Sequence, residues 1–198
     1  FEHCYLDLYQ GDPAVEPNTY SMLRLQDCYK FQVVPDSIDA SFILGGQGNL
    51  WTESVPHYRQ VEYMTWPRAM AISETLWNDT CSRNWKFFIQ RVEKQFTYLD
   101  QLGVNYSRSL YDPIIQPFMN SHNQLQIELK TEIDGLDIFY SFDNTIPDIY
   151  SSLYTGPLSV PKNASMLKIV TYKGQQQMGK QISLTIDELK KRIIENSK

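Results

Sequence analysis

The stretch Ile43-Leu-Gly-Gly-Gln-Gly-Asn-Leu-Trp-Thr-Glu53 is the most informative part of the chain. It follows Ala40-Ser-Phe42, so a short apolar run leads into the glycine pair Gly45-Gly46. An apolar run bounded by glycine is typical of a buried strand that ends in a tight turn. We therefore expect a strand over residues 40–46, with Trp51 and Glu53 on the segment that follows it.

Trp51-x-Glu53 has a counterpart near the start of the chain, Tyr5-x-Asp7. On an extended backbone, residues i and i+2 point to the same side, so each pair would present one aromatic ring and one carboxylate to one space. A sugar ring can lie against the aromatic ring while the carboxylate accepts hydrogen bonds from its hydroxyls. Either pair also occurs by chance in many proteins, so a purely structural role stays open for each.

Two segments in the first half of the chain have helical periodicity. Residues 57–77 form one, and Pro67 predicts a kink or a new first turn inside it. Residues 84–102 form the clearer one, with Asn84 as the N-cap and Gly103 as the terminator. Its apolar residues fall three and four positions apart, which predicts one buried face: Trp85, Phe88, Val92, Phe96 and Leu99.

The composition changes near residue 111, so we predict two domains, 1–110 and 111–198, with a hinge at Tyr111-Asp112-Pro113 and Pro117. The second domain is expected to be a small β-sandwich followed by a terminal helix over residues 189–195. Thr185-x-x-Glu188 predicts a capping box for that helix. The expected strands are residues 124–130, 137–142, 158–160, 167–172 and 181–186.

Charge and composition exclude several classes of protein. The 198 residues carry 18 Lys and Arg against 23 Asp and Glu, a net charge of −5, which argues against a nucleic-acid partner. No apolar run reaches the roughly 18–20 residues that a membrane span needs. The three cysteines, Cys4, Cys28 and Cys81, have no metal-binding spacing, even with His3, so we expect buried thiols and neither metal nor cofactor. A single disulfide stays open.

Residues 43–53, followed by Val61-Glu-Tyr-Met-Thr-Trp-Pro-Arg-Ala-Met-Ala-Ile-Ser-Glu-Thr-Leu-Trp77, resemble the end of the catalytic domain of family 20 glycoside hydrolases, the β-N-acetylhexosaminidases. Tyr5-Leu-Asp7 resembles the motif that follows the preceding barrel strand in that family. The resemblance covers residues 3–105 and implies the last two βα units of a (β/α)8 barrel. Residues 140–157 are similar to the β-domain often appended to such enzymes, with Asp143-Asn144 where Asp-Gly is usual.

This resemblance implies roles for four residues in a sugar pocket. Tyr5 would donate a hydrogen bond to the substrate's acetamido carbonyl, Trp51 would form a wall, and Glu53, with Asp7 nearby, would accept from sugar hydroxyls. The family's chemistry is retaining and substrate-assisted, because the acetamido oxygen attacks the anomeric carbon. An adjacent Asp-Glu pair supplies the general acid and orients the acetamide. The only Asp-Glu here, Asp187-Glu188, is assigned to capping, so no catalytic residue is predicted in this chain.

The chain begins without Met, and a whole barrel needs about 250 residues, so we interpret it as a piece of a longer enzyme that is inactive alone. Its expected partners are N-acetylhexosamine-terminated glycans and the remainder of the barrel, and the resemblance suggests a periplasmic or secreted protein. The alternative is a non-catalytic carbohydrate-binding or interaction module whose working part is the β-domain.

Three further residues have expected structural roles. Arg68 is expected to form a buried ion pair with Glu62 or Glu74, although its place beside Pro67 could also put it in the pocket. Gln10-Gly11 could line the pocket rim or belong to a plain loop.

Overall fold

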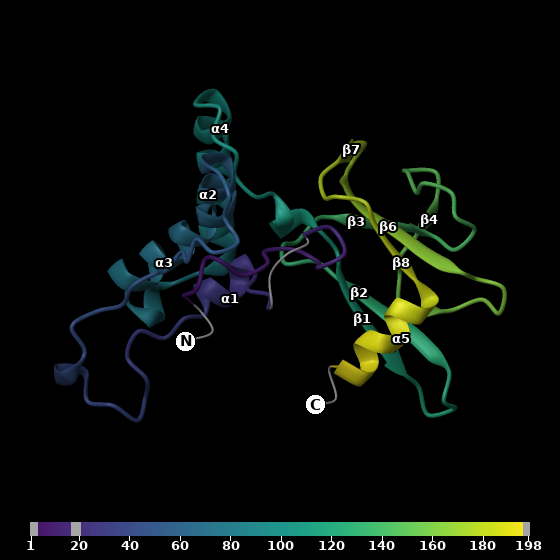
Figure 1. The fold of residues 1–198 in the computed structure, drawn as a ribbon, viewed down its shortest axis with the longest axis horizontal. Helices are drawn as coiled ribbons and strands as arrows, with labels where there is room; N and C mark the ends of the chain where they lie inside the picture. The colour runs from purple at the N-terminus through teal and green to yellow at the C-terminus, as the bar shows by residue number, and fades with distance from the viewer. Residues whose placement is uncertain (1–3, 17–20, 196–198) are drawn as a thin grey trace. The chain divides into compact units, whose positions relative to one another are not determined.

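The computed structural model describes residues 4–16 and 21–195. The chain divides into two compact units, Phe1–Ser107 and Arg108–Lys198, which are described separately (Figure 1). The division lies three residues before the domain boundary that the sequence suggests.

The first unit is mainly helical within its described residues. The predicted helix over 57–77 is confirmed as two helices, because it breaks at the Trp66–Pro67 peptide, which is cis. Pro67 becomes the N-cap of the second helix, where its missing N–H costs nothing. The elements are α1 (Leu25–Tyr29), η1 (Ala40–Phe42), α2 (Tyr58–Thr65), α3 (Arg68–Trp77), η2 (Thr80–Ser82) and α4 (Trp85–Gln101).

Helix α4 follows its prediction closely. The Asn84 side chain accepts a hydrogen bond from the backbone N–H of Phe87 at 3.1 Å, and Gly103 ends the helix region with φ of +67°. The central apolar residues of the predicted stripe are buried, while Trp85 and Leu99 at its ends are half-buried. The ring of Phe88 stacks on Tyr29 of α1 at 4.8 Å between centroids, which holds the two helices together.

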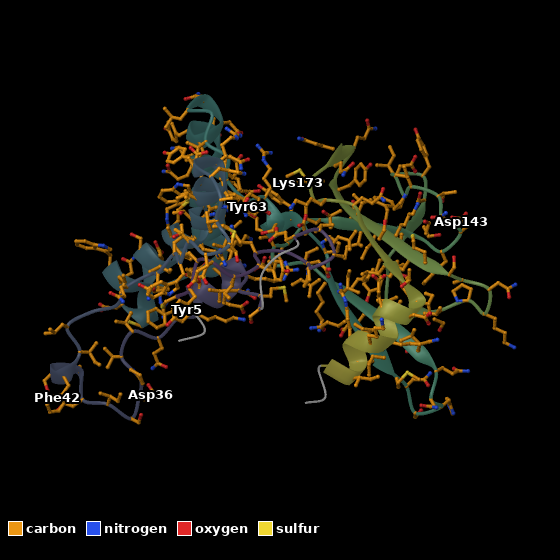
Figure 2. The ribbon with its side chains drawn as sticks, viewed as in Figure 1. Tyr5, Asp36, Phe42, Tyr63, Asp143 and Lys173 are labelled. Atoms are coloured by element: carbon orange, nitrogen blue, oxygen red, sulfur yellow. The ribbon has the colours of Figure 1, made fainter. Side chains whose placement is uncertain are left out.

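The predicted strand over residues 40–46 is wrong for this structure. Residues 40–42 form the 3₁₀-helix η1, and Phe42 and Leu44 are exposed; Figure 2 shows Phe42 on the segment between α1 and α2. A strand needs a hydrogen-bonded neighbour on at least one side. In the described part of this unit, β pairing consists of two parallel bridges, Tyr5↔Asn49 and Tyr9↔Met22. The parallel direction suits neighbouring barrel strands, and the count of two βα units stays a prediction.

The second unit contains two antiparallel sheets. One has the order β1-β2-β5, and the other has β4-β3-β6-β7 with β8 also paired to β6. All five predicted strands are confirmed with small shifts at their ends. The strands are β1 (Ile114–Met119), β2 (Leu125–Lys130), β3 (Asp137–Ser141), β4 (Ser152–Leu153), β5 (Leu158–Ser159), β6 (Met166–Lys173), β7 (Gln176–Gln177) and β8 (Ile182–Thr185).

Strand β1 corrects the expectation of a hinge that extends to Pro117. Pro117 lies inside β1, opposite Ile127 of β2. Because β1 is at the edge of its sheet, the N–H that proline lacks is not needed there. The hinge prediction failed because proline was taken as a break, although an edge strand accepts it.

Both sheets and the terminal helix α5 (Ile186–Glu195) contribute to the core of this unit. Thr185 and Glu188 form the predicted capping box: Thr185 N–H donates to Glu188 Oε2 at 2.7 Å, and Glu188 N–H donates to Thr185 Oγ1 at 3.2 Å. The helix buries Leu189 completely. The most deeply buried apolar residues of the strands are Ile127, Leu129, Leu167, Ile169, Val170, Ile182 and Leu184.

Candidate functional site

The two segments that carry the predicted sugar-binding residues meet at the Tyr5↔Asn49 bridge. Leu6 N–H donates to the Asn49 carbonyl at 2.6 Å, and Asn49 N–H donates to the Cys4 carbonyl at 2.9 Å. Because the pairing is parallel, Asp7 and Trp51 each follow two residues after the bridge, in the same direction. The fold therefore brings the beginnings of the two motifs together, although they are more than forty residues apart in sequence.

The assumption of an extended backbone at these motifs is wrong. Both Asp7 and Glu53 lie in turns, and Val55 N–H closes the turn at Glu53 by donating to the Thr52 carbonyl at 3.1 Å. The four side chains also differ in burial. Asp7 is buried and Tyr5, labelled in Figure 2, is half-buried, whereas Trp51 has an exposed fraction of 54% and Glu53 is exposed. Alternation of i and i+2 therefore does not explain their placement, and their roles rest on the family motif.

Arg68 fixes the backbone around Asp7. Its side chain is fully buried at the start of α3. Nη1 donates to the carbonyls of Leu8 at 3.0 Å and Leu23 at 3.1 Å, and Nη2 donates to those of Leu6 at 2.6 Å and Met64 at 2.9 Å. The flat guanidinium fork can satisfy several carbonyls at once, so it joins α3 to both residues that flank Asp7.

The expected ion pair of Arg68 with Glu62 or Glu74 is wrong. Glu62 instead accepts from Asn105 N–H at 3.0 Å, and Glu74 pairs with Arg91. Burial lowers the pKa of Arg68 to about 10, while nearby ionisable groups, Asp7 among them, oppose the shift. The prediction failed because carbonyl oxygens, which are invisible in a sequence pattern, can solvate a buried cation.

The sequence patterns did not indicate Glu16, a buried carboxylate that accepts hydrogen bonds in the first unit. Its Oε2 accepts from the backbone N–H groups of Gln10 at 2.8 Å and Gly11 at 3.0 Å, and its Oε1 accepts from the hydroxyl of Tyr63 on α2. Figure 2 labels Tyr63. Gln10 and Gly11 are therefore buried in a loop that a carboxylate organises. A glutamate inside a loop has no periodic signal, so only the fold identifies it.

The three cysteines are free thiols: Cys28 is buried, Cys4 is half-buried, and Cys81 is exposed, contrary to the expectation that all would be buried. His3 lies outside the described residues. Within residues 4–16 and 21–195, no group of three or more metal-ligating side chains could hold a metal ion. In the same residues, every helix is too short or too polar to span a bilayer.

Two family models match the chain, one on each unit. Residues 1–80 match "Glycosyl hydrolase family 20, catalytic domain", and residues 120–183 match "Chitobiase/beta-hexosaminidase C-terminal domain". The solved structure of a mutant Streptomyces plicatus beta-hexosaminidase in complex with its product GlcNAc aligns with a TM-score of 0.50 and 23% identity, over 55% of this chain and 22% of that one. This likeness supports a fold of a partial barrel with an appended sheet domain.

Sequence relatives carry the same description. A beta-hexosaminidase of Porphyromonas gingivalis is 30% identical over 84% of this chain, and one of Akkermansia muciniphila is 30% identical over 46% of it. The chain spans about a fifth of the length of these curated relatives, 22% and 19% respectively. Motifs, fold and relatives thus define a glycoside hydrolase segment. The chain belongs to the family 20 glycoside hydrolases, and it contains part of a catalytic domain followed by a C-terminal domain of the family.

Proposed function

We propose that the protein containing this chain is an exo-acting β-N-acetylhexosaminidase, and that Tyr5, Asp7, Trp51 and Glu53 contribute to its sugar pocket. The observation that carries the proposal is the parallel bridge that sets the Tyr5 segment beside the Trp51 segment. The family match over residues 1–80 and the named beta-hexosaminidase relatives support it.

The proposed reaction is retaining and substrate-assisted. The acetamido oxygen attacks the anomeric carbon while the glycosidic C–O bond breaks, and a general acid protonates the leaving oxygen. Tyr5 donates to the acetamido carbonyl, Trp51 forms a wall, and Glu53 and Asp7 accept from hydroxyls. The sole Asp-Glu pair of this chain, Asp187-Glu188, caps α5, so the general acid comes from another part of the protein.

The test is Glu53→Gln in the full-length protein. The matched control is Glu128→Gln, which changes a half-buried carboxylate of the second unit that pairs with Lys130 at 3.0 Å. A lost charge-assisted hydrogen bond of about 1.5–3 kcal/mol lowers kcat/KM on an aryl N-acetyl-β-glucosaminide by roughly 10- to 100-fold, with the melting temperature nearly unchanged. A variant that loses stability but keeps kcat/KM contradicts the sugar-contact role. The isolated chain should show no turnover above background.

A non-catalytic carbohydrate-binding module is the second candidate. A hollow on the second unit, lined by aromatic rings, hydroxyls and a carboxylate, favours it. The two functions are compatible in one protein, because the hollow belongs entirely to the second unit.

A further inference from the structure

The second unit has a hollow of about 480 Å³ between the end of β3 and the turn that precedes β4. Residues of β3 and its following loop form one wall, and the turn with β4 forms the other. Figure 2 labels Asp143 in the loop. The lining residues used below are Tyr140, Phe142, Asp143, Tyr150 and Ser151.

Aromatic rings supply a surface on which a flat ligand could lie. Tyr150 is the most exposed of them, with an exposed fraction of 89%. The rings of Tyr140 and Phe142 meet edge to face, with centroids 5.8 Å apart. An aromatic ring left this exposed gains by covering its apolar face while its hydroxyl still reaches a polar partner.

Asp143 supplies a fixed negative charge at the same place. Its Oδ1 accepts from the backbone N–H of Thr145 at 3.1 Å and from the Thr145 hydroxyl at 2.6 Å. These bonds lower the pKa of Asp143, so it is ionised at neutral pH. Since Oδ1 takes both bonds and an ionised carboxylate accepts at two oxygens, Oδ2 keeps acceptor capacity for a ligand.

Local hydrogen bonds hold the turn that carries Tyr150. The Tyr150 N–H donates to Asp148 Oδ1 at 2.9 Å, the Ser151 N–H donates to the Asp148 carbonyl at 3.0 Å, and the Asp148 N–H donates to Ser151 Oγ at 2.9 Å. Opposite it, Asn144 adopts φ of +68°, and its carbonyl accepts from Lys168 Nζ at 2.7 Å. With both walls ordered in advance, ligand binding costs little conformational entropy.

We propose that this hollow is a second carbohydrate site, in which a neutral pyranose of an oligosaccharide stacks on Tyr150 and donates hydroxyl hydrogen bonds to Asp143. The exposed ring of Tyr150 matches the apolar face of a sugar ring, and the ionised carboxylate of Asp143 matches its hydroxyl edge. An anionic group placed against the Asp143 carboxylate would be repelled, so we expect neutral glycans to bind better than sialylated ones even with the Lys168 ammonium nearby. The site does not depend on the proposed catalytic function.

The test is calorimetric titration of the 198-residue chain with chitotetraose and maltotetraose as neutral probes and sialyllactose as the anionic probe. We expect saturable binding of at least one neutral tetrasaccharide, weakened about tenfold or more by Tyr150→Ala and by Asp143→Asn. The control is Tyr98→Ala, an exposed tyrosine of α4, which should leave this binding unchanged. Trp51→Ala reports separately on the proposed catalytic pocket. Melting curves verify that each variant folds.

Several results would overturn the proposal. They are the absence of saturable binding of both neutral probes, tighter binding of sialyllactose, and full binding by a folded Tyr150→Ala variant. Binding lost in Trp51→Ala but kept in Tyr150→Ala would likewise refute this site, while favouring the pocket of the proposed function. The two proposals therefore fail separately.

Discussion

Arg68 Nη2 donates a hydrogen bond to the carbonyl oxygen of Leu6 at 2.6 Å, across 62 positions of sequence. Together with its bond to Leu8, this contact makes a buried cation of α3 the anchor of the backbone on either side of Asp7. The proposed sugar pocket is thus built on a helix that follows it in sequence. Changes at Arg68 should act on stability first and on the pocket through the backbone.

Arg68→Lys is expected to destabilise the first unit by about 3–5 kcal/mol, although the charge is kept. An ammonium has three donors on one atom and cannot serve four carbonyls that surround a flat fork. Urea unfolding of the chain measures the loss. Arg59→Lys is the control, because Arg59 is exposed and its side chain donates to the Gly103 carbonyl at a long 3.5 Å. Equal stability of the Arg68→Lys variant and the original chain would contradict the anchoring role.

Gly179→Ala should destabilise the second unit by about 1–3 kcal/mol through overpacking. A Cβ at Gly179 would lie 2.6 Å from the Tyr111 carbonyl oxygen and 2.5 Å from Thr171 Oγ1, two atoms already joined by a hydrogen bond. Gly156→Ala is the matched control, since a Cβ there meets no atom within 4 Å. Thermal melting of both variants measures the loss of stability. Similar melting temperatures for the two variants would contradict the overpacking, because they would show that the Tyr111 backbone shifts at little cost.

Glu188→Gln should remove about 0.5–1 kcal/mol of stability at pH 7, a typical contribution of a helix cap. Hydrogen bonds from Thr185 lower the pKa of Glu188 below its ordinary 4.5. A carboxyl with a lowered folded-state pKa stabilises above its unfolded pKa and loses that contribution as the pH falls through the folded value. The difference between the original chain and Glu188→Gln should therefore be constant above about pH 5.5 and shrink below pH 4.5.

Urea unfolding at a series of pH values measures this difference, with Asp134→Asn as the control for removing an exposed carboxylate from the same unit. A difference that persists unchanged into strong acid would show that the charge of Glu188 is not what stabilises the helix.

Trp51→Ala in the full-length protein should lower kcat/KM for an aryl N-acetyl-β-glucosaminide by at least about tenfold, or 1.4 kcal/mol of transition-state stabilisation. Trp77→Ala is the matched control, because Trp77 is a more exposed tryptophan at the end of α3. Steady-state kinetics of both variants distinguishes the loss of a pocket wall from the loss of any surface tryptophan. Equal activity of the two variants would remove Trp51 from the pocket.

Local patterns in the sequence were sufficient for the longer helices, α2 to α5, and for five of the strands, whereas α1 was not predicted. Asn84, Gly103, Pro67 and the Thr185–Glu188 box act within a few residues of their own position, so their effects can be read along the chain. The alternation in residues 125–130 likewise needed no knowledge of the partner strand. The family motifs around Tyr5 and Trp51 indicated the class of enzyme in the same local way.

Tertiary structure alone decided how the candidate site is held together. Whether residues 40–46 form a strand depended on the pairing partners available to them. Whether Pro117 fits inside a strand depended on which strand lies at the edge of the sheet. The hydrogen-bond partners of Arg68 and Glu16 include backbone groups. Residue spacing does not predict any of these features, because each depends on contacts between segments that are distant in sequence. A buried charge forms hydrogen bonds with the donors or acceptors that the fold places beside it. The sequence determined which residues could carry the chemistry, whereas the fold decided which of them are buried, exposed or fixed in place, since desolvation and hydrogen bonding depend on neighbours in space.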